Sequence, residues 1–246
     1  MEKILALWTT PRATSTAFEC MMQERGDFGV HDEPFGLSYY YSKERCNTTR
    51  YPDIEPKAEY NFSSILEKLK QETEKQPVFI KDLSYYVTHI ANQEFLSHFQ
   101  NTFLIRNPVK MLPSLFELRS DFTLKETGYE GVYKLFHQVK EITGKVPILI
   151  DSDDLVQKPE VTVKAYCHAV GIPFIKEALE WKAESQTQIN EWEGGWHTYA
   201  LSSSYFHERK QRNYARIEDN AHLKQAYEYC LPYYQKLYEH RLRIDV

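Results

Sequence analysis

The chain has 246 residues, and its 30 Lys and Arg against 35 Asp and Glu give a formal net charge of −5. This mild acidity argues against non-specific nucleic-acid binding, which normally requires a basic surplus. With 42% apolar and 26% charged residues, the composition is typical of a globular protein with a sizeable core. No apolar run approaches the ~20 residues that span a bilayer, and the first apolar stretch is too short for a secretory signal.

Four widely separated cysteines without a Cys-x-x-Cys pair predict reduced thiols in a cytosolic protein. The nine histidines lack the spacing of zinc ligands. No internal repeat or low-complexity linker interrupts the chain, so we expect residues 1–246 to form a single domain. We also expect a cytoplasmic location, with no nucleic-acid or membrane partner, and the oligomeric state stays open.

Short, almost wholly apolar runs alternate with longer amphipathic stretches. They predict strands at 3–8, 28–31, 78–81, 102–106 and 147–151. Helices are predicted between them at 15–24, 60–75, 87–99, 109–119 and 129–144. Strands that are apolar at nearly every position are typical of parallel sheets covered on both faces. The pattern therefore predicts a three-layer, doubly wound α/β fold with about five parallel strands.

Only helical patterns follow the last predicted strand. Helices are predicted at 160–170 and at about 220–241, where Pro232 is expected to bend the second. The aromatic and polar stretch 185–218 is interpreted as loops with short helices. Residues 47–57 are rich in turn formers and predict a mobile surface loop.

A polar loop joins the predicted strand at 3–8 to the predicted helix at 15–24. Such a sharp turn exposes the free N–H groups of the helix at the carboxyl edge of the sheet, where the helix dipole favours an anion. Arg12 adds a full positive charge, and the hydroxyl donors are Thr14, Ser15 and Thr16. The loop therefore indicates a phosphate site, although it lacks the glycines and the lysine of a nucleotide-kinase loop. The alternative is a Ser/Thr cap that only begins a helix.

A second strand-to-helix junction carries a matching set of donors. The strand at 102–106 ends in Arg106, and Ser114 follows eight residues later, about one and a half turns into the next predicted helix. Both side chains can then face the crevice at the carboxyl edge of the sheet. A guanidinium and a hydroxyl together predict a clamp for a second phosphate group.

Together the two junctions resemble the donor-binding signature of sulfotransferases that use 3′-phosphoadenosine 5′-phosphosulfate (PAPS). That family has a Pro-Lys/Arg-Ser-Gly-Ser/Thr-Thr loop around the 5′-phosphosulfate and an Arg-Asn-Pro…Ser segment, with the same spacing of eight, around the 3′-phosphate. Residues 11–16 match the loop with Ala13 in place of Ser and Thr14 in place of Gly, while residues 106–108 and Ser114 match the segment closely. A third similar stretch, 150–160 followed by 171–174, comes in the family's order.

The resemblance implies a P-loop NTPase-like fold with a helical C-terminal part. It implies transfer of a sulfuryl group from PAPS to a hydroxyl or amine of a small acceptor, which leaves 3′,5′-adenosine bisphosphate. No metal is expected, because a sulfuryl group carries less charge than a phosphoryl group. The residues expected to bind the donor are Arg12, Ala13, Thr14, Ser15, Thr16, Arg106 and Ser114, with Ser203 and Arg212 from a late basic segment.

For the general base we favour Glu33, at the carboxyl end of the predicted strand 28–31. Residues 31–35 (His-Asp-Glu-Pro-Phe) are similar to small bacterial and plant sulfotransferase-like proteins with a Glu-Pro pair at this point. His31 and Asp32 are competing candidates because the strand register is uncertain, and a surface turn is the non-functional interpretation.

Two cations complete the candidate catalytic set. Arg12 would stabilise charge on the leaving phosphate. Lys81, at the end of another strand, would contact the sulfate or would simply end the strand. Leu83 stands where cytosolic members of the family carry their catalytic histidine, which is a further reason to favour Glu33.

Two other functions fit the same pattern. A P-loop kinase or NTP hydrolase would need magnesium and would not need a 3′-phosphate on its nucleotide. A catalytically silent nucleotide-binding module of the same fold is the other alternative, because the loop departs from the family at Ala13 and Thr14.

Overall fold

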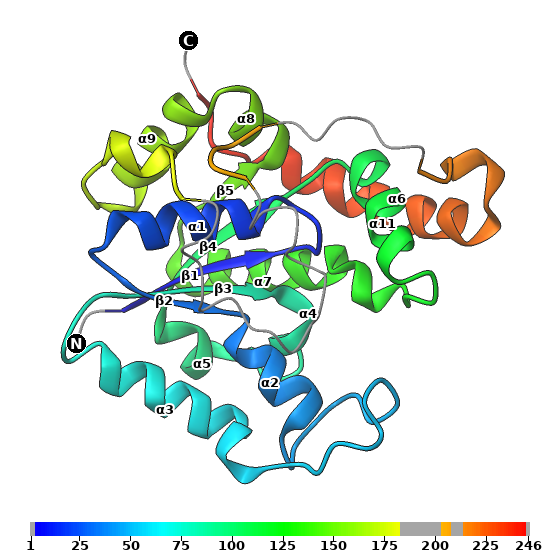
Figure 1. The fold of residues 1–246 in the computed structure, drawn as a ribbon, viewed down its shortest axis with the longest axis horizontal. Coiled ribbons are helices and arrows are strands. Elements are labelled where there is room, and N and C mark those ends of the chain that lie inside the picture. The colour runs from blue at the N-terminus through cyan, green and yellow to red at the C-terminus, as the bar shows by residue number, and fades with distance from the viewer. Residues whose placement is uncertain (1–2, 183–202, 208–213, 245–246) are drawn as a thin grey trace.

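Five parallel strands form one sheet in a computed structural model of the chain, which describes residues 3–182, 203–207 and 214–244. The strands are β1 (Ile4–Thr9), β2 (Gly29–Asp32), β3 (Val78–Leu83), β4 (Phe99–Ile105) and β5 (Ile148–Asp151). Their order in the sheet is β2-β3-β1-β4-β5 (Figure 1). The order reverses beside β1, so the crevice between the loops after β1 and β4 is the place where doubly wound folds bind ligands.

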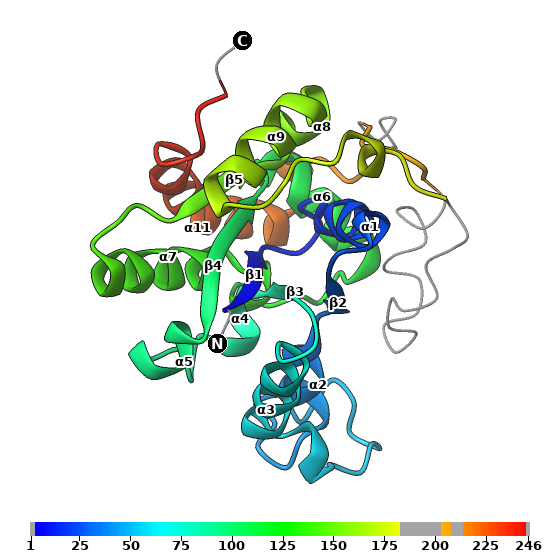
Figure 2. The same cartoon turned by 90° about the vertical axis from the view of Figure 1, so that its left-hand side faces the viewer.

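Helices cover both faces of the sheet, as the apolar strands predict (Figure 2). Along β1, Ile4, Ala6 and Trp8 enter one core, whereas Leu5 and Leu7 enter the other. The second core is closed by α1 (Ser15–Arg25), α8 (Ser152–Gln157) and α9 (Pro159–Val170). The first core is closed by α2 (Pro34–Tyr41), α3 (Phe62–Glu72), α4 (Ser84–Val87), α5 (Gln93–Ser97), α6 (Pro108–Leu118), α7 (Tyr129–Thr143) and α11 (Ala221–Tyr238).

The remaining described elements are four 3₁₀ turns. They are η1 (Ala58–Tyr60), η2 (Lys125–Thr127), η3 (Lys176–Leu179) and η5 (Ile217–Asp219). In the described part of the chain, no helix has the length and apolar character needed to cross a bilayer. Pro232 lies inside α11, and its expected bend stays a prediction.

The structure corrects the predicted helix at 87–99. Two short helices, α4 and α5, replace it, and Phe99 already belongs to β4. The break comes at Asn92, whose side chain accepts a 2.8 Å hydrogen bond from the backbone N–H of Phe95 and thereby begins a new helix. The pattern also missed α2 and α8, the first of which begins directly after Glu33.

Candidate functional site

The loop after β1 has a backbone that ordinary residues rarely adopt. Arg12 and Thr14 have left-handed φ angles of 58° and 68°, and Glu33, after β2, has a φ of 46°. In the described part of the chain these are the non-glycine residues with positive φ, and all three were singled out in the sequence as site residues. A side chain in this conformation costs on the order of 1 kcal/mol or more, and such strain gathers at functional sites.

The two predicted anion sites lie against each other. The Arg106 guanidinium donates a 2.8 Å hydrogen bond from Nη1 to the carbonyl oxygen of Arg12. In return, Nε of Arg12 donates to the hydroxyl of Ser114, at 3.2 Å. The hydroxyl of Tyr129, in α7, donates to the Arg106 carbonyl and fixes the end of β4. The structure therefore brings Arg12, Arg106 and Ser114 together at the carboxyl edge of the sheet.

Thr14 does not act as a helix cap. It occupies the N-cap position of α1, but its side chain makes no capping hydrogen bond. Its hydroxyl is instead 2.7 Å from the hydroxyl of Ser152, which begins α8 after β5. The third stretch of the family resemblance thus meets the first. Ser15 and Thr16 form the first turn of α1, where backbone N–H groups have no acceptor within the helix, and Ala13 is fully buried.

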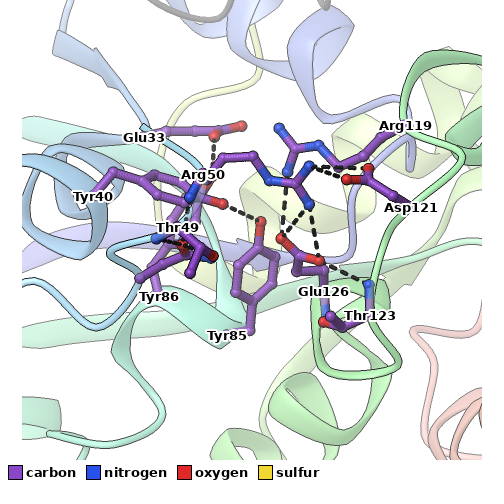
Figure 3. Close-up of polar contacts among 11 residues, drawn as sticks. Glu33, Tyr40, Thr49, Arg50, Tyr85, Tyr86, Arg119, Asp121, Thr123 and Glu126 are labelled. Carbon is purple, nitrogen blue, oxygen red and sulfur yellow. Dashed lines mark hydrogen bonds and ion pairs between the residues drawn. The ribbon is translucent and has the colours of Figure 1, made fainter. Parts of the chain in front are cut away.

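A buried group of charges lies behind this loop. Lys81, in β3, is fully buried and forms ion pairs with Asp32, with Glu33 at 2.9 Å and with Glu19 at 3.5 Å. The hydroxyl of Tyr86 donates to the second oxygen of Glu33 at 3.3 Å (Figure 3). Glu19 projects from α1 one turn after Ser15, so the group connects Glu33 to the N-terminal end of that helix.

Three carboxyl groups share one ammonium group, and burial decides their charges. Desolvation raises the pKa of Glu33, although Lys81 and the hydrogen bond from Tyr86 act in the opposite direction. Desolvation and the neighbouring Asp32 raise the pKa of Glu19 well above its usual value. The nearby carboxylates outweigh the desolvation of Lys81 and raise its pKa as well. Both directions favour a charged Lys81 beside carboxyl groups that hold their protons more tightly than exposed ones do.

His31 does not join this group. Its Nε2 is 2.8 Å from a carboxylate oxygen of Glu72 in α3, on the face of the sheet opposite to α1. Asp32, one residue later, points to Lys81 and Glu19 because successive strand residues face opposite sides. His31 lines a pocket of about 290 Å³, which is also lined by Lys68, Leu69 and Glu72 of α3. The expectation that His31 competes with Glu33 as the base is therefore not supported by the geometry.

Lys81 also differs from the expected sulfate contact. Its side chain has no exposed surface, and carboxylates surround its ammonium group. The geometry therefore does not support a direct contact between Lys81 and the sulfate. Ser203 is buried, with 8% of its surface exposed. The carbonyl oxygen of the next residue, Ser204, accepts a 2.9 Å hydrogen bond from the backbone N–H of Trp181. Arg212 lies outside the described residues, so its predicted role stays a prediction.

Several residues of the site carried no sequence signal. Glu19 is one polar residue in a mostly buried helix, and Tyr86 is one of two adjacent buried tyrosines in α4. Arg50, in the segment 42–57, and Arg119, at the end of α6, converge on Glu126, close to Tyr85 (Figure 3). A pairing of two loops that are about 70 residues apart leaves no local pattern that could predict it.

Asp151, at the end of β5, is a further buried carboxyl group. It accepts hydrogen bonds from the N–H of Asp153 at 2.8 Å and the hydroxyl of Tyr234 at 3.2 Å. Desolvation and the nearby Asp153 and Asp154 nevertheless raise the pKa of Asp151 to about 6. A carboxyl group whose pKa is raised by folding destabilises the folded state as the pH rises from about 4 through 6.

Asp151→Asn should therefore make the protein more stable at pH 7.5, by about 3 kcal/mol at most, because the amide carries no charge. Its oxygen can still accept from the N–H of Asp153, and its NH₂ group can donate to the Tyr234 hydroxyl instead of accepting from it. The gain should vanish near pH 4. Urea unfolding at the two pH values measures it, with exposed Asp53→Asn as the control. Equal stability of the variant and the wild type at pH 7.5 would contradict the raised pKa.

The comparisons agree with this architecture. The family model described as a sulfotransferase domain matches residues 2–239. The chain therefore belongs to the sulfotransferase-domain family. Its fold is similar to the sulfotransferase domain of the curacin biosynthetic pathway, with a TM-score of 0.52 and 15% identity over 97% of this chain and 98% of that one. The sulfotransferase domain of the Synechococcus PCC 7002 olefin synthase gives a TM-score of 0.53 and 15% identity, over 92% and 94%.

Two plant relatives cover almost the whole chain. The branched-chain-amino-acid aminotransferase-like protein 1 of Arabidopsis thaliana is 28% identical over 97% of this chain. The like-named protein 2 of the same plant is 26% identical over 96%. The match covers 42% and 41% of the two relatives, so the chain spans about two fifths of their length. Their names refer to an aminotransferase, whereas the family that matches this chain is that of sulfotransferase domains.

Proposed function

We propose that the protein transfers a sulfuryl group from PAPS to a hydroxyl or amine of a small acceptor. The observation that carries the proposal is the direct contact between the two anion sites, through the Arg106 guanidinium and the Arg12 carbonyl. PAPS bears phosphates on both its 5′ and 3′ sides, and two neighbouring sites that each supply a guanidinium match that charge distribution.

The described residues fit the donor chemically. The strained loop exposes Arg12 and the first turn of α1 to a 5′-phosphosulfate, and Arg106 with Ser114 supplies a guanidinium and a hydroxyl to a 3′-phosphate. In this structure the Ser114 oxygen accepts from Arg12, and the same hydroxyl can donate its hydrogen to a 3′-phosphate. The donor supplies the sulfuryl group; the chain supplies orientation, positive charge and a base.

Each part of the site has a distinct task. Arg12 and the N-terminal end of α1 stabilise the negative charge that develops on the departing phosphate. Glu33 accepts the proton of the acceptor's hydroxyl or amine at its carboxylate. Lys81 and Tyr86 hold that carboxylate in place, since both contact its oxygens. Glu19, whose pKa is raised well above its usual value by burial and by Asp32, holds a proton more tightly than an ordinary glutamate and so limits the negative charge around Lys81.

Other properties stay proposals of the same kind. They are the cytoplasmic location, the absence of nucleic-acid and membrane partners, and catalysis without a metal. Catalysis without a metal distinguishes a sulfotransferase from a P-loop kinase, which needs magnesium. The nucleotide-binding experiment below is therefore run in EDTA, which removes magnesium.

A thermal-shift panel in EDTA tests the donor class. We expect 3′,5′-adenosine bisphosphate to raise the melting temperature by several degrees, and ADP or ATP to raise it far less at the same concentration. The reason is that a ligand that binds the folded state stabilises it by RT ln(1 + [L]/Kd), so at equal concentration the nucleotide with the lowest Kd gives the largest shift. Equal shifts for the three nucleotides would favour the kinase or NTP hydrolase. A bisphosphate shift without turnover on any acceptor would favour the silent module.

A further inference from the structure

Two arginines and two carboxylates form a cluster near Tyr40, Tyr85 and Tyr86 (Figure 3), and the last of these tyrosines donates to Glu33. Nη1 of Arg50 donates to both oxygens of Asp121, at 2.9 and 2.8 Å. Nη2 of Arg50 donates to Glu126 at 3.2 and 3.4 Å, and Nη1 of Arg119 lies 3.6 Å from Glu126. The cluster joins the segment 42–57 to the connection between α6 and α7.

The two carboxylates have very different surroundings. The side chain of Glu126 is 4% exposed, and it also accepts a 2.7 Å hydrogen bond from the backbone N–H of Thr123. That of Asp121 is 73% exposed. The guanidinium groups are mostly enclosed, with 20% of Arg50 and 8% of Arg119 exposed. Within this cluster, two enclosed cations thus face one enclosed anion and one that lies largely in water.

An exposed ion pair contributes about 0–1 kcal/mol. Another carboxylate can therefore replace Asp121 on Arg50 at little cost. The geometry that Asp121 adopts shows that a planar carboxylate fits this side of Arg50 with both of its oxygens bonded.

The cluster is connected to Glu33 by aromatic rings. Tyr51, next to Arg50 in the chain, packs edge-on against Tyr40 with ring centroids 5.2 Å apart. Tyr40 packs in the same way against Tyr86, at 5.6 Å, and Tyr86 donates to Glu33. The cluster thus belongs to the surroundings of the proposed base.

We propose that Arg50 and Arg119 form a carboxylate seat for the acceptor, and that Asp121 occupies the seat in the absence of ligand. The inference rests on the proposed function for its use in catalysis, but binding of the carboxylate does not depend on PAPS. It narrows the acceptor to a hydroxy- or amino-carboxylic acid, with its carboxylate on the arginines and its reacting group towards Glu33.

Binding of a simple carboxylate tests the seat directly. Melting temperatures are measured with benzoate and with its neutral analogue benzamide, at equal ionic strength adjusted with chloride. At about a tenfold excess over Kd, benzoate should raise the melting temperature of the wild type by about 3–6 °C, and benzamide should not. Asp121→Asn should show a larger benzoate shift, because the internal competitor has lost its charge.

Arg50→Gln should lose the benzoate shift, and Arg119→Gln serves as a second variant if the first fails to fold. Arg45→Gln is the matched control from the same segment, since Arg45 donates to the Ile54 carbonyl outside the cluster. Equal shifts for benzoate and benzamide in both the wild type and Asp121→Asn would overturn the seat, as would a benzoate shift that persists in Arg50→Gln.

The 3′,5′-adenosine bisphosphate shift is recorded on the same samples. A normal bisphosphate shift with no benzoate effect in the wild type or in Asp121→Asn overturns the seat alone. A benzoate shift that is lost in Arg50→Gln, in a protein whose melting temperature the bisphosphate does not change, supports the carboxylate seat and overturns the proposed donor.

Discussion

Replacement of Glu33 by Gln is expected to lower turnover by about 10²–10⁴-fold, the usual contribution of a general base. The amide has nearly the same shape but cannot accept the acceptor's proton. Affinity for 3′,5′-adenosine bisphosphate should stay unchanged, because the donor contacts proposed above lie on the loop after β1 and at the end of β4. Formation of the bisphosphate from PAPS, with a panel of hydroxy- and amino-acids as acceptors, measures the loss.

Tyr86→Phe is the matched control for Glu33→Gln. It removes the 3.3 Å hydrogen bond to Glu33 and leaves the carboxylate and its ion pair with Lys81 in place. Its loss of turnover should therefore be much smaller. The raised pKa of Glu33 also predicts that activity falls, on acidification, at a higher pH than an ordinary glutamate would give. Full activity of Glu33→Gln would transfer the base to another residue.

Lys81→Met is expected to destabilise the fold by roughly 3–5 kcal/mol, the usual effect of removing one partner from a buried ion pair. Glu19, Asp32 and Glu33 would then lie close together without a cation. Repulsion between carboxylates requires that they be ionised, so the loss should be larger at pH 8 than at pH 5.5. Urea unfolding at both pH values measures the loss.

Two further variants show whether the loss of stability in Lys81→Met comes from the buried charges. Lys70→Met removes a lysine that is paired with Glu67 at 3.2 Å on the surface of α3, and it should cost about 1 kcal/mol or less. Glu19→Gln added to Lys81→Met should restore part of the stability, because one carboxyl group of the cluster is then permanently neutral. A Lys81→Met protein within 1 kcal/mol of the wild type would show that the cluster does not need its cation.

The fold was largely predictable because its signals are local. Apolar runs placed all five strands, and only β4 began well before its predicted start, at Phe99. The helix α2 was missed because its sequence, Pro-Phe-Gly-Leu-Ser-Tyr-Tyr-Tyr, is almost entirely buried and has no polar face to reveal a helical period. The helix predicted at 87–99 failed because the cap at Asn92 interrupts an apolar pattern that otherwise continues.

The site was predictable where its residues sit at chain junctions. Arg12, Arg106 and Ser114 follow strand ends, so the topology alone brings them to one edge. The roles of His31, Asp32 and Lys81 depended on which face of a strand each side chain takes, and a shift of one residue exchanges the faces. Glu19 and Lys81 are 62 residues apart in the chain, and only the packing of α1 on β3 brings them together.

The central claim is that Arg106 recognises the 3′-phosphate of a bis-phosphorylated nucleoside at the junction with the Arg12 loop. Isothermal titration in EDTA with 3′,5′-adenosine bisphosphate and with 5′-AMP, which lacks that phosphate, tests it most directly. The wild type should bind the bisphosphate at least tenfold more tightly, since a charge-assisted hydrogen bond contributes about 1.5–3 kcal/mol. Arg106→Ala should bind the two nucleotides almost equally. An Arg106→Ala protein that keeps the full preference for the bisphosphate would contradict the account.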